Sequence, residues 1–183
     1  MQVRRTAIPD VVVVEPRVFG DERGFFFESF NRKQLEDALG RSLEFVQDNH
    51  SRSGRGVLRG LHYQLPNPQG KLVRVVRGEV LDVAVDLRRG SPTLGRWVLE
   101  TLSAENKRQL WIPEGFGHGF LVVSDEAEVL YKTTELYSAA NDRGIAWDDP
   151  AIGVAWPSRP GGPVLSDKDR RWPRLKDAPE LFE

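Results

Sequence analysis

The sequence predicts an all-β fold, a jelly-roll β-sandwich or barrel with one or two short helices. Strand-like segments dominate the chain, one segment reads convincingly as a helix, and 17 glycines and 12 prolines punctuate the rest. Many short strands separated by turn residues are typical of sandwiches and barrels. With 183 residues, the chain is expected to form a single domain over residues 1–183.

The strand predictions follow from runs of apolar, β-branched and aromatic residues, several with alternating polarity. The four valines at 11–14 read as a buried strand. In the segment 71–87, Gly78 is the expected turn between two strands. The other expected strands are 42–49, 57–64, 95–103, 108–113, 119–124 and 128–137.

The predicted helix covers residues 31–40. Asn31 is a suitable N-cap with Gln34 three residues later, and Gly40 suits the C-terminal stop. A turn is expected at Asp21–Gly24. Four prolines in the stretch 149–163 predict irregular covering structure there.

Composition excludes several classes of function. A formal net charge of -1 provides no basic field, so we expect no binding to nucleic acid or to an anionic membrane. The longest apolar run is far too short to span a bilayer, and the N-terminal segment has charges where a secretory signal needs an apolar core. The chain has no cysteine, which excludes disulfides and thiolate chemistry and fits a cytoplasmic location.

His62 lies in the apolar strand-like stretch "VLRGLHYQ" at 57–64. Strict alternation puts His62 on one face of the strand with the other even-numbered residues, and Arg59 on the opposite face, although Gly60 permits a bulge that alters this register. Such a histidine is more often a hydrogen-bonded core residue than a catalyst. The other candidates that a jelly roll could gather around one cavity with it are Lys71, His118 and Tyr131.

Metal binding is the weaker interpretation of these histidines. "PEGFGH" at 113–118 has the spacing of one half of the cupin metal signature, but His62 is followed by Tyr63 and Gln64, where the other half needs a second histidine. Because the only histidines are at 50, 62 and 118, a three-histidine site would need all of them. We therefore expect no metal and no other cofactor.

Two charged segments have both a plain and a functional interpretation. "LSDKDRRWP" at 165–173 reads as a charged turn, but Asp169 could also orient the imidazole of His62 and stabilise its protonated form. "VFGDERGFFFESFN" at 18–31 reads as packing by phenylalanines, but Arg23, an aromatic face and Glu28 also suit a nucleotide base with its phosphates. No glycine-rich phosphate loop is present, so any phosphate must be held by Arg and Lys side chains.

In order along the chain, these motifs together resemble the dTDP-4-dehydrorhamnose 3,5-epimerase family, from about residue 18 to about residue 170. The resemblance implies a cupin-like jelly roll, a homodimer, no metal, and a role in making dTDP-L-rhamnose for bacterial surface polysaccharide such as lipopolysaccharide O-antigen. The motifs are "FGDERGFFFESFN", "FVQDNHS", "VLRGLHYQ", "GKLVRVVRGEVLDVAVDLR", "SPTLGRW", "NKRQLWIPEGFGHGFLV", "LYKTTELY" and "LSDKD".

Carried over position by position, the resemblance gives His62 as the base, Asp169 as its carboxylate partner and Tyr131 as the proton donor on the opposite face of the sugar. Lys71 and His118 line the sugar site. The nucleotide- and diphosphate-contacting positions are Arg23, Glu28, Gln47, Asn49, Arg59 and Lys168. The chain departs from the family pattern at 138–144, where Asp142 is expected to replace a Glu, and at Leu136, where an aromatic residue is common.

The chemistry of a dTDP-linked 4-keto-6-deoxy sugar fits these residue types. Carbons 3 and 5 flank the ketone, so a neutral imidazole can remove a proton from either to leave an enolate. Lys71 is the first candidate to stabilise the oxyanion, and Tyr131 could return a proton to the other face. The alternatives are an epimerase acting only at carbon 5 or carbon 3, a 3,4-ketoisomerase, a non-catalytic sugar-nucleotide-binding jelly roll, and a metal-dependent cupin oxygenase.

Overall fold

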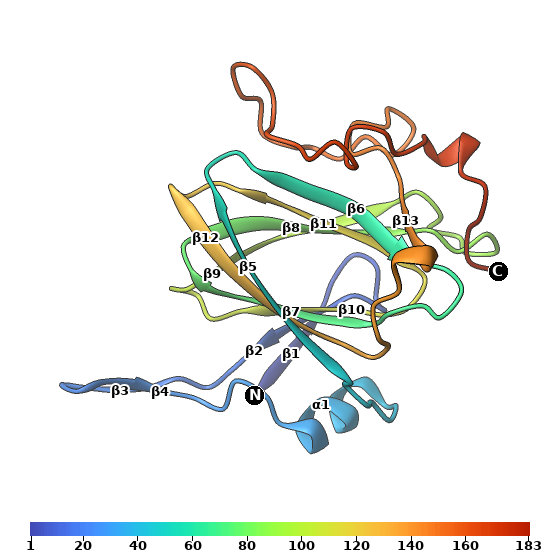
Figure 1. Cartoon of the computed structure of the whole chain (residues 1–183). Helices are drawn as coiled ribbons and strands as arrows, with labels where there is room; N and C mark the ends of the chain where they lie inside the picture. The colour runs from blue at the N-terminus through green and yellow to red at the C-terminus, as the bar shows by residue number, and fades with distance from the viewer.

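The computed structural model of the protein describes residues 1–183. Two open antiparallel β-sheets packed face to face form the body of the molecule (Figure 1). The six-stranded sheet runs in the order β1 (Gln2–Arg5), β2 (Val12–Glu15), β10 (Gln109–Ile112), β7 (Lys71–Arg77), β12 (Glu126–Thr133) and β5 (Gln47–Gly54). The five-stranded sheet runs in the order β13 (Asp142–Gly144), β6 (Leu58–Gln64), β11 (Phe116–Val122), β8 (Glu79–Asp86) and β9 (Trp97–Ser103). The predicted all-β jelly-roll fold is confirmed, as an open sandwich rather than a closed barrel.

The main apolar core lies between the two sheets. Alternate residues of each strand point inward, as the two-residue period of a strand requires. Val73 and Val75 of β7 contribute from one sheet, and Val80 and Ala84 of β8 from the other; all four are at most 4% exposed. Burying each of these valine side chains contributes about 1.5–3 kcal/mol to stability.

The predicted helix is confirmed as α1 (Arg32–Leu39). The Oδ1 atom of Asn31 accepts a hydrogen bond from the backbone N–H of Gln34 at 3.1 Å, and Gly40 ends the helix with a left-handed φ of 69°. Two short 3₁₀ turns follow much later, η1 (Ala139–Asn141) and η2 (Leu175–Asp177). None of these helices has the length and apolar character needed to cross a bilayer.

The expected strand at 42–49 is wrong in its boundaries, because β5 begins only at Gln47 and continues to Gly54. Leu43 does not join the sheet; it is buried against Leu35 of α1 and Trp111 of β10, and so anchors the helix on the outer face of the six-stranded sheet. The strand expected at 128–137 likewise ends at Thr133. The prolines of 149–163 do produce the predicted irregular segment, and the chain after β13 crosses over β6 (Figure 1).

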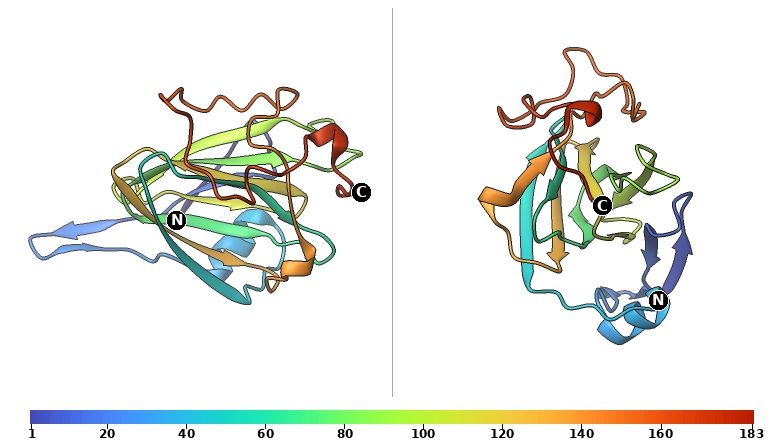
Figure 2. Two further views of the ribbon diagram at one scale, coloured as in Figure 1. Left: turned by 45° about the horizontal axis from the view of Figure 1, so that its top comes forward. Right: turned by 90° about the vertical axis from the view of Figure 1, so that its right-hand side faces the viewer.

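A small hairpin projects from the body of the molecule (Figures 1 and 2). It consists of β3 (Phe19–Asp21) and β4 (Gly24–Phe26), joined at the turn that the sequence predicts, and all six strand residues are exposed. Phe25 and Phe26 are 62% and 69% exposed. An apolar arm of this kind does not contribute to the core of its own chain.

Candidate active site

A β-bulge in β6 decides which side chains of "VLRGLHYQ" face the interior. His118 of β11 pairs with His62 and Phe120 pairs with Arg59, so Gly60 and Leu61 together face the single residue Gly119. The extra residue cancels the alternation between positions 59 and 62. The prediction that Arg59 and His62 lie on opposite faces is therefore wrong, and both line one cavity.

Only glycine fits at the bulge. Gly60 has a φ of +130°, and a Cβ atom there would lie 2.5 Å from the Cα of Gly119 and 2.8 Å from the carbonyl oxygen of His118. Both distances are well inside van der Waals contact, and side chains rarely adopt this backbone conformation. The glycine at position 60 thus allows the bulge that places Arg59 and His62 on the same face of β6.

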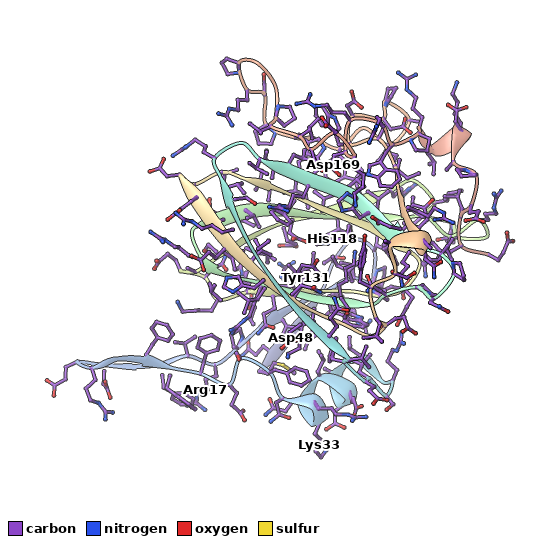
Figure 3. The ribbon with its side chains drawn as sticks, in the orientation of Figure 1. Arg17, Lys33, Asp48, His118, Tyr131 and Asp169 are labelled. Carbon is purple, nitrogen blue, oxygen red and sulfur yellow. The ribbon has the colours of Figure 1, made fainter.

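The cavity has a volume of about 570 Å³ and lies between the two sheets, below the C-terminal segment. Figure 3 shows His118 and Tyr131 between the sheets and Asp169 on the segment above them. The predicted site residues that line the cavity are Gln47, Asn49, Arg59, His62, Lys71, His118, Tyr131, Asp142, Lys168 and Asp169.

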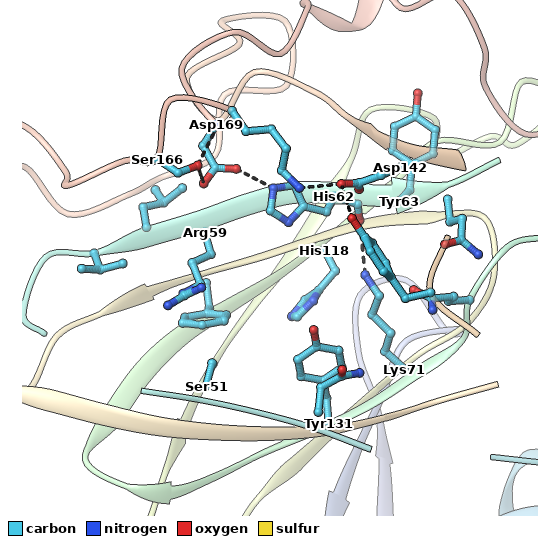
Figure 4. A pocket seen from close by; sticks show the side chains of 18 of the residues that line it. Ser51, Arg59, His62, Tyr63, Lys71, His118, Tyr131, Asp142, Ser166 and Asp169 are labelled. Carbon is cyan, nitrogen blue, oxygen red and sulfur yellow. Dashed lines mark hydrogen bonds and ion pairs between the residues drawn. The ribbon is translucent and has the colours of Figure 1, made fainter. Parts of the chain in front are cut away.

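His62 and Asp169 form a hydrogen-bonded pair on the upper wall of the cavity (Figure 4). His62 Nε2 lies 2.5 Å from Asp169 Oδ1, and Ser166 Oγ donates to the other carboxylate oxygen at 2.7 Å. Burial raises the pKa of the Asp169 carboxyl. The hydrogen bond and charge of His62, with further hydrogen bonds from Ser166 and the Gly60 backbone, together outweigh burial and leave this pKa below its ordinary value. Because an ionised carboxylate only accepts hydrogen bonds, Nε2 carries the proton and Nδ1 is left as the basic atom.

Trp172 packs behind this pair. Its ring is T-shaped to the His62 ring at a centroid distance of 6.1 Å, and it occupies the place that a Cβ atom on Gly144 would need. Gly144 is the register partner of His62 on β13. The indole therefore packs against the outer side of the His62 imidazole and restricts its movement.

Lys71 and Tyr131 approach the cavity from the six-stranded sheet, opposite His62. Lys71 begins β7, is only 7% exposed, and places Nζ 3.4 Å from the carbonyl oxygen of His62. Burial lowers the pKa of Lys71 to about 8, against the charges of Asp142 and Asp82, which raise it. Burial also raises the pKa of the Tyr131 phenol, which is thus a proton donor at neutral pH.

At the rim, charged and amide groups surround the opening of the cavity. Lys168 Nζ donates to Asp142 at 2.5 Å, and both residues line the cavity. Gln47 Nε2 donates to Asn49 Oδ1 at 2.8 Å, and Arg59 Nε donates to Ser53 Oγ at 3.0 Å, from β6 to β5.

Two predicted residues lie away from the cavity. Arg23 is at the tip of the β3–β4 hairpin, with 86% of its side chain exposed, and pairs with Asp21. Glu28 accepts hydrogen bonds from the side-chain amides of Asn31 and Gln34 at the start of α1. Within one chain, neither Arg23 nor Glu28 lines the cavity with the other predicted site residues.

Asp82 is a site residue that the sequence reasoning missed. It is fully buried on β8, and both of its oxygens lie 3.0 Å from Nε2 of His118. A signal was present, because Asp82 alternates with Val80 and Ala84 and thus lies on an apolar, inward face of β8. His118 itself is 7% exposed, and burial lowers its pKa.

The three histidines do not converge. His50 is exposed on β5, where it pairs with the half-buried Glu128. The structure contains no group of three or more His, Asp or Glu side chains arranged to hold a metal ion. The histidine set of this chain therefore does not build the cupin-type metal site considered from the sequence.

Comparisons with known proteins show the family of the chain. A family model described as dTDP-4-dehydrorhamnose 3,5-epimerase matches residues 5–177. The enzyme of that name from Shigella flexneri is 64% identical, with 97% of this chain and 98% of the relative aligned, and the one from Pseudomonas aeruginosa is 61% identical over 97% and 98%. The crystal structure of dTDP-6-deoxy-D-glucose-3,5-epimerase from Legionella pneumophila in complex with dTDP-4-keto-L-rhamnose is 50% identical, with a TM-score of 0.93 and 96% and 93% of the two chains covered. The chain belongs to the dTDP-4-dehydrorhamnose 3,5-epimerase family.

Proposed function

We propose that this protein inverts carbons 3 and 5 of dTDP-4-dehydro-6-deoxy-D-glucose to give dTDP-4-dehydro-L-rhamnose. The observation that carries this proposal is the placement of His62 and Tyr131 on opposite sheets around one cavity, with Asp169 bonded to the imidazole. An inversion next to a ketone needs a base on one side of the ring and an acid on the other.

The base in this proposal is Nδ1 of His62. Asp169 holds the proton on Nε2 and stabilises the imidazolium that forms when Nδ1 takes a proton from carbon 3 or carbon 5. The electrons of the broken C–H bond move into the ring to give an enolate, whose negative charge lies on oxygen 4. No oxidation or reduction takes place.

Lys71 stabilises the enolate oxygen. A buried ammonium acts on a developing oxyanion more strongly than an exposed one, because little water screens it. Its position beside the His62 backbone supports this role. Tyr131 then delivers its phenolic proton to the opposite face of the carbon. Solvent reprotonates the phenol and takes the abstracted proton from the His62 imidazolium, which returns both residues to their starting states.

We assign the nucleotide end of the dTDP-linked sugar to the residues at the rim of the cavity. Arg59 and Lys168 are suited to the diphosphate, because both donate only and stay positively charged at neutral pH. Gln47 and Asn49 provide amide donors and acceptors beside them. Asp142 holds Lys168 at the rim.

We further propose that the protein is a homodimer in which the hairpin of one subunit completes the site of the other. Arg23 and Glu28 match nucleotide-contacting positions of the family, yet they lie away from the cavity of their own chain. Exposed phenylalanines on the same arm favour burial against a second copy. A single domain over residues 1–183 and a cytoplasmic location stay predictions.

The reaction is tested by incubating the enzyme with dTDP-4-dehydro-6-deoxy-D-glucose in deuterium oxide and locating the label by NMR. We expect deuterium at both carbon 3 and carbon 5 of the product. Label at a single carbon would identify an enzyme that inverts only that centre, and a migrated ketone would identify a ketoisomerase.

A His62→Ala variant tests the base within the same assay. We expect turnover to fall by about 10²–10⁴-fold, which is the usual contribution of a general base. His50→Ala is the matched control, because His50 is exposed and pairs with Glu128 outside the cavity. Binding without turnover in the wild-type protein would instead favour a sugar-nucleotide-binding module.

A further inference from the structure

Each of the three histidines bonds to a carboxylate through Nε2. The pairs are His50 with Glu128, His62 with Asp169, and His118 with Asp82. The first pair is exposed and the second is the proposed base with its partner. The third is buried at the floor of the cavity, and the proposed proton transfers do not use it.

Asp82 depends on His118 for its hydrogen bonds. The carboxylate is 0% exposed, and its strand neighbours on the same face, Val80 and Ala84, belong to the apolar core. Its two oxygens are each 3.0 Å from His118 Nε2, and no other hydrogen bond reaches them. A buried carboxylate without a donor is costly, so this arrangement keeps a proton on Nε2.

The other nitrogen of His118 is then free for a ligand. The ring lines the cavity, and Nδ1 is its only polar atom without a protein partner. Burial lowers the pKa of His118, as do the charges of Lys71 and His62, while Asp82 opposes them. A neutral ring with its proton on Nε2 has an unshared electron pair on Nδ1 and accepts a hydrogen bond there.

The cationic groups that line the cavity cannot accept a hydrogen bond from the sugar. Lys71 and Arg59 can only donate hydrogen bonds, and Nδ1 of His62 is reserved for the proton from carbon. A sugar hydroxyl that enters this cavity needs an acceptor for its own proton. His118 Nδ1 meets that need from the five-stranded sheet.

We propose that Asp82 is a positioning residue that fixes His118 as the neutral Nε2–H tautomer, so that His118 Nδ1 accepts a hydrogen bond from a hydroxyl of the bound sugar. This role rests on the proposed function, since it takes the ligand to be a keto sugar with free hydroxyls. A site that accepts from a hydroxyl discriminates against analogues that lack it, so the pair contributes to substrate selection.

The tautomer can be observed directly because the chain has only three histidines. Long-range ¹H–¹⁵N spectra of protein labelled with ¹⁵N-histidine distinguish a protonated from an unprotonated ring nitrogen, and His50→Gln and His118→Gln variants assign the signals. At pH 7 we expect His118 to carry its proton on Nε2 alone. A doubly protonated ring, or a proton on Nδ1, would overturn the proposal.

An Asp82→Asn variant tests the consequence for binding. The amide has the size of the carboxylate but can donate as well as accept, so it no longer fixes the tautomer. We expect a mixture of His118 tautomers and a KM for the keto sugar that is about three- to tenfold higher, with kcat changed less, as for the loss of one neutral hydrogen bond. Glu128→Gln makes the same change next to His50, and it should alter neither the His118 tautomer nor the KM for the keto sugar.

An unchanged KM in Asp82→Asn, or a loss confined to kcat, would contradict this role. Circular dichroism and the melting temperature show whether the variant is folded; if it is not, the spectrum of the wild-type protein still decides the tautomer. If the wild-type protein does not turn over the keto sugar, the proposed function fails, while the spectrum reports on Asp82 and His118 independently.

Discussion

Lys71 illustrates how burial sets the chemistry of one side chain. Its ammonium is almost fully enclosed at the start of β7, and burial lowers its pKa to about 8. Near neutral pH the group is still mostly protonated and can stabilise an enolate. In mildly alkaline solution it loses the charge on which that role depends.

The pH dependence of turnover tests this role. We expect kcat of the wild-type enzyme to decline above about pH 8, as Lys71 is deprotonated. A Lys71→Arg variant stays charged throughout, because a guanidinium has a pKa above about 12, so its decline should move to higher pH even if its maximal rate is lower. Lys132→Arg is the control, because Lys132 pairs with the exposed Asp48 and does not line the cavity. An alkaline decline that is the same in Lys71→Arg as in wild type would exclude Lys71 as its source.

Sequence reasoning at the residue scale found several of the side chains that line the cavity, but it did not find Asp82 behind them. His62, Lys71, His118 and Tyr131 lie on separate strands, and the jelly-roll arrangement does bring them together. Asp82 was missed because an acid within a strand usually marks the solvent face. Only the packing of its strand neighbours identifies it as buried.

At the scale of elements, the β6 bulge places Arg59 and His62 on the same wall. Alternation alone predicts the opposite, because it assumes that every residue of β6 has one partner on β11. The glycine in "VLRGLHYQ" made the bulge conceivable, but its presence depends on the close approach of Gly119 on the neighbouring strand. Long-range contacts of this kind cannot be read from a single strand.

A Gly60→Ala variant should therefore lose both stability and activity. The added Cβ would overlap Gly119 and the His118 carbonyl, and the left-handed backbone adds strain, so we expect a loss of about 2–4 kcal/mol in the free energy of unfolding. Gly161→Ala is the matched control, because Gly161 also has a positive φ but a Cβ atom added there would have no neighbour within 4 Å. Denaturant titration compares the two; equal losses would mean that the close approach at Gly60 has no energetic effect.

The helix and β5 show what sets the limits of such predictions. The helix was located correctly because its caps, Asn31 and Gly40, are local signals. The start of β5 was misplaced because Leu43 has strand-like neighbours in the sequence yet packs beneath α1. A hydrophobic residue in the sequence indicates that the side chain is buried. Which element buries it depends on the tertiary structure.

At the scale of the whole molecule, the β3–β4 hairpin projects from the two sheets (Figures 1 and 2), and none of its residues lines the cavity. The sequence assigns Arg23 to the nucleotide, and the structure places it at the tip of the exposed arm. The proposed two-fold dimer, in which the arms are exchanged, would bring Arg23 of one subunit to the cavity of the other. In such a dimer each active site combines residues of both subunits.

Mixing two inactive variants tests the exchange of arms. In a mixed dimer of His62→Ala and Arg23→Ala subunits, one site has both lesions and the other has neither, if the arm acts on the partner. We therefore expect an equimolar refolded mixture to recover about a quarter of the wild-type activity, by the statistics of random pairing in a symmetric dimer. Light scattering should give the mass of a dimer for both variants. No recovery in mixed dimers would mean that each arm serves its own subunit or none.

The central claim is that a base and an acid act from opposite walls of the cavity, and hydrogen exchange in a Tyr131→Phe variant tests it most directly. This variant keeps His62 and Asp169 but has no acid on the opposite side. In deuterium oxide we expect the substrate to gain deuterium at carbons 3 and 5 with its configuration retained, because His62 removes a proton and returns a deuteron to the same face, while inversion falls by about 10²–10⁴-fold. Inversion at the wild-type rate in Tyr131→Phe, or loss of exchange together with inversion, would contradict the two-sided mechanism.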